Sequence, residues 1–158
     1  NAQKYLNQAL EIKGEKAEDL LYKGQISYLL GDYKTAVTDL TNAKEDGQQK
    51  ASYYLGLTYE AQGDTDKAQS YIKEYLDSGV ATSYELYDLG SSELDDGDYE
   101  EALTFFNAGL ALEKVPNKQN LMKSAIAAYE YSGDFDSAKT IKSASEYNSL
   151  FSCLSTTK

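Results

Sequence analysis

The sequence predicts an all-α fold built from antiparallel helix hairpins. From 20 to 43, LLYKGQISYLLGDYKTAVTDLTNA, apolar and small residues recur at three- and four-residue spacing on both sides of Gly31-Asp32-Tyr33. Each half therefore has a stripe to bury against the other half. The joint recurs at Gly63-Asp64-Thr65, Gly97-Asp98-Tyr99 and Gly133-Asp134-Phe135, at intervals of 32, 34 and 36 residues. A row of helix hairpins follows from these two observations.

The residues around each joint suit a tight turn between closely packed helices. Gly31 fits the left-handed conformation that ends a helix, and the Asp32 carboxylate can cap the next helix. Small residues stand where the two helices must approach each other. They are a glycine seven residues before the glycine of each of the first three joints (Gly24, Gly56, Gly90) and an alanine five residues after the glycine of every joint (Ala36, Ala68, Ala102, Ala138).

Helix hairpins at a period of about 34 residues resemble the tetratricopeptide repeat, and the resemblance covers nearly the whole chain. Repeat two carries Tyr54-Leu55-Gly56, Tyr59, Gly63-Asp64, Ala68 and Ile72, and repeat three carries Leu86, Leu89-Gly90, Gly97-Asp98-Tyr99, Ala102 and Phe106. The departures from the family pattern are Lys23, Glu93 and Ile126. The resemblance implies a right-handed α-solenoid whose first helices line a concave groove and whose second helices form the outer surface.

The chain is predicted to be a single repeat domain over 1–158. Its parts are the second helix of a truncated repeat (1–13), repeats at 17–47, 49–80, 83–114 and 118–147, and a C-terminal cap (148–158). Ala2, Leu6 and Ala9 have the spacing of Ala36, Leu40 and Ala43, so we expect the chain to come from a longer array. Predicted helices span 17–30, 33–44, 49–62, 65–77, 83–95, 99–112, 118–131 and 135–147.

Composition disfavours several classes of partner. The 158 residues are 41% hydrophobic, which is enough for a sizeable core, and no apolar run is long enough to cross a bilayer. With a net charge of −11 and no arginine, the chain repels nucleic-acid phosphates and anionic membrane surfaces. Ten carboxylates and no lysine lie from Asp77 to Glu113, which predicts either a solvated face or a docking surface for basic partners.

Catalysis is not expected, because a chain without histidine lacks the usual general base and imidazole metal ligands. The glycines follow the repeat period rather than forming a phosphate loop, and Asp95-Asp96-Gly97-Asp98 lacks the pattern of a calcium loop. Cys153 is predicted to pack as a small hydrophobe. We therefore expect no catalytic residue, cofactor or metal.

The resemblance also predicts which side chains face the groove. Tyrosine, present 15 times, offers a flat apolar ring and a hydroxyl, which suits a binding surface, although such rings can also fill gaps between repeats. The predicted groove residues are Leu21, Gln25, Tyr28, Lys50, Tyr53, Tyr54, Leu57, Tyr84, Tyr87, Ser91, Lys123 and Tyr131. The clamp by which chaperone-binding relatives hold a terminal carboxylate is absent: Leu21, Gln25, Tyr54, Tyr84 and Asp88 stand at its positions.

The leading hypothesis is a non-catalytic module that binds a peptide or protein segment, with apolar anchors and some basic residues, in a tyrosine-lined groove. One alternative is a structural spacer or self-association module of a larger cell-surface protein, and self-association would give homodimers. The other is a docking or regulatory part of a larger enzyme. Lysine without arginine and abundant tyrosine suggest an AT-rich bacterial genome. An acidic repeat domain of this kind fits the exposed part of a bacterial lipoprotein slightly better than a cytoplasmic adaptor.

Overall fold

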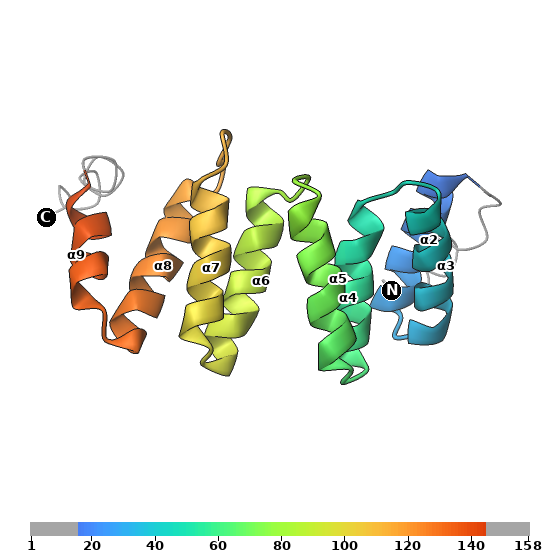
Figure 1. Ribbon diagram of the computed structural model, residues 1–158, viewed down its shortest axis with the longest axis horizontal. Helices are drawn as coiled ribbons and strands as arrows, with labels where there is room; N and C mark the ends of the chain where they lie inside the picture. Colours follow the sequence, from blue (N-terminus) through green and yellow to red (C-terminus); the bar gives the residue numbers. More distant parts are fainter. Residues whose placement is uncertain (1–15, 145–158) are drawn as a thin grey trace, which may run out of the picture. The chain divides into compact units, whose positions relative to one another are not determined.

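The computed structural model describes residues 16–144, and within this range every regular element is an α-helix (Figure 1). The elements are α2 (Ala17–Leu29), α3 (Tyr33–Glu45), α4 (Lys50–Ala61), α5 (Thr65–Asp77), α6 (Ser83–Asp96), α7 (Tyr99–Leu110), α8 (Lys118–Ser132) and α9 (Phe135–Ser143). The all-α class and the helix hairpins are confirmed. Up to the start of α9 the predicted bounds agree within two residues, whereas α9 ends at Ser143, before the predicted 147. The predicted segments 1–13 and 148–158 lie outside the described residues.

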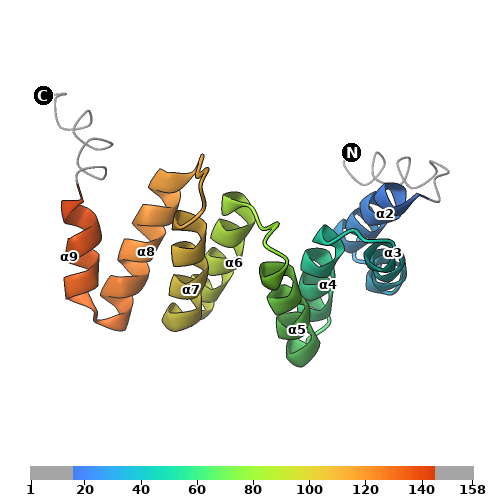
Figure 2. The same ribbon diagram turned by 45° about the horizontal axis from the view of Figure 1, so that its top comes forward.

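The helices group in two compact units, Asn1–Ala81 and Thr82–Lys158, which are called unit 1 and unit 2 below. In unit 1, α2 pairs with α3 and α4 pairs with α5, while α4 also contacts α2 and α3 (Figure 2). In unit 2, α7 packs between α6 and α8, α8 pairs with α9, and α6 also contacts α8. Each unit is thus two stacked hairpins. The prediction of one domain over the whole chain stays a prediction.

The four joints have the predicted turn and cap chemistry. Each joint glycine has a positive φ, for example 86° at Gly97, which is a conformation that favours glycine. The aspartate after it accepts a hydrogen bond from the backbone N–H three residues on. These bonds run from Thr35 to Asp32 (3.2 Å), Lys67 to Asp64 (3.3 Å), Glu101 to Asp98 (3.3 Å) and Ser137 to Asp134 (3.0 Å). A reciprocal capping box forms at the start of α6, between Thr82 and Glu85.

Close helix packing explains the small residues of the repeat. A Cβ added at Gly90 would lie 2.6 Å from the Phe106 ring and 3.1 Å from the Ala102 carbonyl oxygen. A Cβ added at Gly24 would likewise lie 2.5 Å from the Leu40 side chain, and one added at Gly56 would lie 2.6 Å from the Ile72 side chain. The alanines of the second helices are buried, as predicted (Ala36, Ala68, Ala102, Ala138). In the fourth hairpin, Ile126 takes the place of the glycine and is itself buried, with 5% of its surface exposed.

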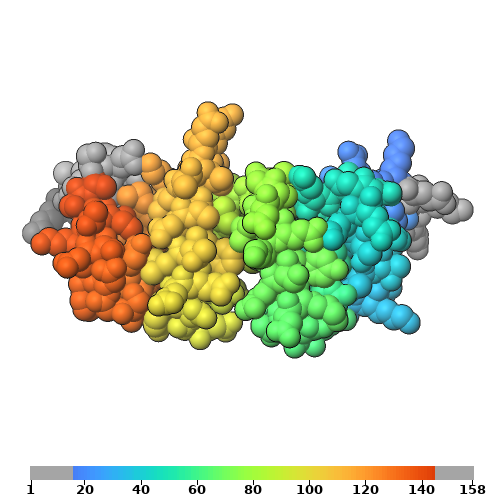
Figure 3. Space-filling view, in the orientation of Figure 1, coloured from blue at the N-terminus to red at the C-terminus, as the bar shows by residue number. Residues whose placement is uncertain are grey.

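The connection between α7 and α8, residues 111–117, stands out from unit 2 (Figure 3). Its base is fixed by Asn117, which is 7% exposed and whose Nδ2 donates a 2.9 Å hydrogen bond to the Ser83 carbonyl oxygen at the start of α6. Val115 packs against the core cluster that contains Phe106 and Leu121. The starts of α6 and α8 are therefore held together. Among the described residues, the helices are too short and too polar to cross a membrane.

We expect Gly90→Ala to lower the free energy of unfolding by about 2 kcal/mol, because overpacked cores lose about 1–3 kcal/mol. The new methyl group would press on Phe106, whose side chain is fully buried. Urea denaturation followed by circular dichroism measures the change. Ser92→Ala, at an exposed position of the same helix, is the control, and equal stability of both variants would contradict the close packing.

The caps also predict an acid dependence. The pKa of Asp32 is lowered by hydrogen bonds from Thr35, and that of Asp134 by hydrogen bonds from Ser137. A lowered folded-state pKa gives stability that is present above the unfolded value and is lost as the pH falls. We expect Asp32→Asn with Asp134→Asn to leave the Tm at pH 7 nearly unchanged, since asparagine caps as well as aspartate. The decrease in Tm between pH 5 and pH 2.5 should become smaller, and an unchanged decrease would count against the two caps.

Candidate functional site

The structure divides the predicted groove residues between the two units. Seven lie in unit 1, on α2 and α4: Leu21, Gln25, Tyr28, Lys50, Tyr53, Tyr54 and Leu57. Five lie in unit 2, on α6 and α8: Tyr84, Tyr87, Ser91, Lys123 and Tyr131. All twelve are on first helices of hairpins, as expected. A single groove through all four first helices stays a prediction, and the two faces are described separately.

In unit 1, two predicted groove residues are buried. Leu21 is 7% exposed and belongs to the core cluster with Leu40 and Leu55. Tyr53 is 6% exposed, and its ring centroid lies 5.1 Å from that of Tyr54 and 5.3 Å from that of Tyr75. The assignment of Leu21 and Tyr53 to an open groove surface is therefore corrected. Both side chains pack against neighbouring helices and leave a partner little surface to contact.

The tyrosines of unit 1 contact one another. The Tyr28 ring lies 6.3 Å from Tyr33 and 6.4 Å from Tyr54, and the series continues through Tyr53 to Tyr75. Tilted and edge-on pairs at such distances stabilise by about 0.5–1.5 kcal/mol each beyond the buried area. Burial raises the pKa of Tyr28, and the negative charge of Glu60 adds to the effect. These rings hold α2, α4 and α5 together.

In unit 2, two of the predicted tyrosines are well exposed. Tyr84 is 56% exposed on α6 and Tyr131 is 67% exposed on α8. Tyr87 is half-buried, with its ring 6.3 Å from that of Phe106, and Ser91 is half-buried beside it on the same helix. Lys123 is exposed on α8. Two of the three predicted groove tyrosines of unit 2 are therefore exposed, whereas those of unit 1 are buried (Tyr53) or half-buried (Tyr28 and Tyr54).

The predicted groove residues of unit 2, together with Asp88 and Asp95, lie on the two neighbouring helices α6 and α8. The starts of α6 and α8 are joined through Asn117 and Ser83, so the two helices run in the same direction. Tyr84 is near the start of α6, whereas Tyr131 is near the end of α8, beside the Tyr99 ring at 5.7 Å. At 1.5 Å per residue the two tyrosines are separated by about 20 Å along the helices. We call this surface the α6–α8 face; it comprises Tyr84, Tyr87, Asp88, Ser91, Asp95, Lys123 and Tyr131.

A further cluster lies on the second-helix side of unit 1. Tyr59 and Tyr71 stack with ring centroids 5.5 Å apart and planes 3° apart. The Lys67 Nζ lies 4.8 Å from the Tyr59 centroid, and the Lys44 Nζ lies 5.2 Å from the Tyr71 centroid. The contacts of the two lysines with these rings were not predicted from the sequence. Each lysine reaches a ring on another helix, Lys67 that of Tyr59 on α4 and Lys44 that of Tyr71 on α5, so spacing within one helix gave no signal.

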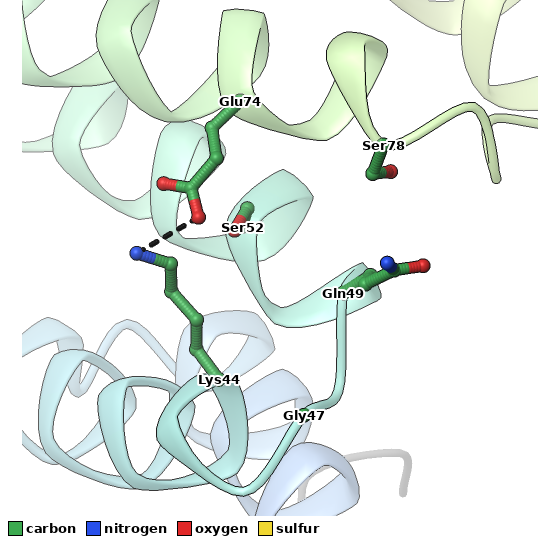
Figure 4. A pocket seen from close by; sticks show the side chains of 6 residues that line it. All are labelled: Lys44, Gly47, Gln49, Ser52, Glu74 and Ser78. Atoms are coloured by element: carbon green, nitrogen blue, oxygen red, sulfur yellow. Dashed lines mark ion pairs between the residues drawn. The ribbon is translucent and has the colours of Figure 1, made fainter.

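Next to this cluster is a pocket of about 200 Å³ in unit 1 (Figure 4). Lys44 and Glu74 reach toward each other across it and form an ion pair of 2.9 Å. The remaining lining residues are Gly47, Gln49, Ser52 and Ser78. The pocket is smaller than the ~300–1,000 Å³ typical of small-molecule sites. The Lys44–Glu74 ion pair links α3 to α5 across the pocket. We assign no ligand to this pocket.

Among residues 16–144, no three cysteine or acidic side chains lie together in a way that would hold a metal ion. The expectations of no metal, no cofactor and no catalytic residue stay predictions. The described surface presents flat aromatic rings, hydroxyl groups and carboxylates, all of which can contact a partner.

Comparison with known proteins gives one finding. Residues 53–118, from α4 to the start of α8, match a family model described as the tetratricopeptide repeat. A search of curated proteins produced no match. The matched range contains the whole α6–α7 hairpin, with the close packing of Gly90 against Phe106.

The different burial of the tyrosines predicts different effects on stability. Tyr53→Ala should lower the free energy of unfolding by about 3 kcal/mol, as expected for removal of a buried aromatic ring. Tyr84→Ala should change it by less than about 0.5 kcal/mol, since its ring is exposed. Urea denaturation of both variants measures the difference. A small effect at Tyr53 would mean that its ring is not part of the core.

Proposed function

We propose, from the premise that the chain belongs to the tetratricopeptide repeat family, that it is a non-catalytic interaction module that binds a segment of a partner protein on the α6–α8 face. Repeats of this family generally mediate protein–protein interaction. The observation that carries the proposal is the exposure of Tyr84 and Tyr131 on first helices, at 56% and 67%.

The dimensions of the face support a peptide segment as the ligand. An extended chain advances about 3.3 Å per residue, so about six residues span the ~20 Å between the two exposed tyrosines. Tyrosine provides a large rigid contact area at small conformational cost, and it is enriched in surfaces that bind proteins. The half-buried Tyr87 and Ser91 lie between the two ends and add a ring and a hydroxyl.

Unit 1 offers a weaker surface for the same purpose. Its Tyr28, Tyr53 and Tyr54 rings contact one another, and Tyr53 and Leu21 are buried. A partner would gain little new apolar contact from Leu21 and Tyr53, and the half-buried Tyr28 and Tyr54 rings already contact each other. The proposed contribution of unit 1 is a stable core next to the binding unit in sequence.

The test is recovery of partners from an extract of the source cell with the full chain as bait. Tyr84→Ala with Tyr131→Ala should lose at least nine-tenths of a partner that the parent protein captures, because both ends of the face are removed. Tyr22→Ala with Leu29→Ala is the matched control, since these α2 residues are 62% and 65% exposed but lie in unit 1. Quantitative mass spectrometry compares the three baits.

Circular dichroism must first show that the three proteins are equally helical and equally stable to heat. Equal capture of the same partner by the parent and by the double tyrosine variant would contradict the assignment of the site. Loss of the partner from the control instead would move the site to unit 1.

A further inference from the structure

We infer that the α6–α8 face takes a basic segment, with two lysine or arginine side chains over α6 and an apolar side chain at each end. This inference rests on the proposed function and names the chemistry of the partner. It comes from the order of side chains along α6, from their charge and from the distances between them.

The side chains in question form one stripe on α6. Tyr84, Asp88, Ser91 and Asp95 follow one another at intervals of four, three and four residues, which places them on the same side of a helix. Tyr84, Asp88 and Asp95 are exposed, and Ser91 is half-buried. Tyr131, on α8, lies at the opposite end of the face from Tyr84. The Tyr131 ring contacts the ring of Tyr99, which follows the end of α6. The order along the face is therefore aromatic, acid, acid, aromatic.

The charge of this stripe is complementary to a cation. The sequence contains no lysine between Lys73 and Lys114, so neither α6 nor α7 carries a basic side chain. The pKa of Asp88 is raised, first by partial burial and then by the negative charge of Glu85. A cation placed beside such a carboxylate favours its charged form. Lys123 lies on α8, so a fitting partner has its basic groups over α6 rather than over α8.

The spacing sets the pattern of the partner. Asp88 and Asp95 are two helical turns, or about 10 Å, apart, and three residues of an extended chain cover the same distance. Tyr84 precedes Asp88 by about 6 Å along the helix, which corresponds to two residues of an extended chain. A segment with an apolar residue, a basic residue two positions on and a second basic residue three further matches α6. About 4 Å along the axis then remains to Tyr131, and because this residue is on the neighbouring helix, about 8–10 Å away, we place the second apolar residue two positions further.

A defined probe tests this pattern. Fluorescein-labelled peptides GLSKSSKSLG and GLSESSESLG, which differ only in charge, are titrated with the full chain and followed by fluorescence anisotropy. We expect saturable binding of the lysine peptide that weakens as salt is raised from 50 to 300 mM, because salt screens exposed ion pairs. The glutamate peptide should bind at least tenfold more weakly.

Two variants with equal change in charge locate the contact. Asp88→Asn with Asp95→Asn should weaken binding of the lysine peptide about fivefold. Asp96→Asn with Glu100→Gln also removes two exposed carboxylates, but these are off the stripe, and binding should change less than twofold. Equal effects of the two variants would reduce the interaction to net charge and overturn the inference.

The inference is also overturned if the lysine peptide does not bind at 1 mM protein, or if both peptides bind equally. The proposed function is judged separately. A partner that is captured through Tyr84 and Tyr131 but is insensitive to Asp88→Asn with Asp95→Asn leaves the interaction module standing and removes only the basic segment. If the variant Tyr84→Ala with Tyr131→Ala captures every partner that the parent captures, the α6–α8 face is contradicted as the binding site as well.

Discussion

The close approach of the two helices in a hairpin is the constraint on which the rest of the structure depends. In the first three hairpins a glycine of the first helix receives a large side chain of the second: Leu40 at Gly24, Ile72 at Gly56 and Phe106 at Gly90. An added methyl group would lie inside the space of these side chains. Because protein cores are close-packed, this contact fixes how near the helices lie and which of their faces remain outside.

The joints make that approach reproducible from one hairpin to the next. A glycine with positive φ ends the first helix, and the following aspartate caps the second, so the chain reverses within a few residues. Each helix then buries its apolar stripe against the other helix of its hairpin and against the neighbouring hairpin of the same unit. The acidic character of the chain is partly a consequence of this design, since each cap adds one carboxylate at an exposed helix start.

The tyrosines serve two purposes that their residue type does not separate. In unit 1 the rings of Tyr28, Tyr53 and Tyr54 contact one another and hold helices together. In unit 2, Tyr84 and Tyr131 stand on the surface with carboxylates between them. Packing against neighbouring rings lowers the free energy of the first set, whereas the second set leaves its contact area exposed, as the proposed binding site requires. The position of a tyrosine in the structure, rather than its residue type, decides whether its ring is buried or exposed.

The sequence by itself determined the helices, their joints and the contact residues of each hairpin, because these depend on local periodicity, cap chemistry and side-chain size. It also identified Tyr84, Tyr87 and Tyr131 as residues of first helices. Only the tertiary structure showed that Leu21 and Tyr53 are buried and that Lys44 and Lys67 lie on the rings of Tyr71 and Tyr59. Helical periodicity identifies the apolar stripe of each helix, but whether a side chain beside that stripe is covered, and which ring it contacts, depends on neighbouring helices and on the rotamers that fit between them.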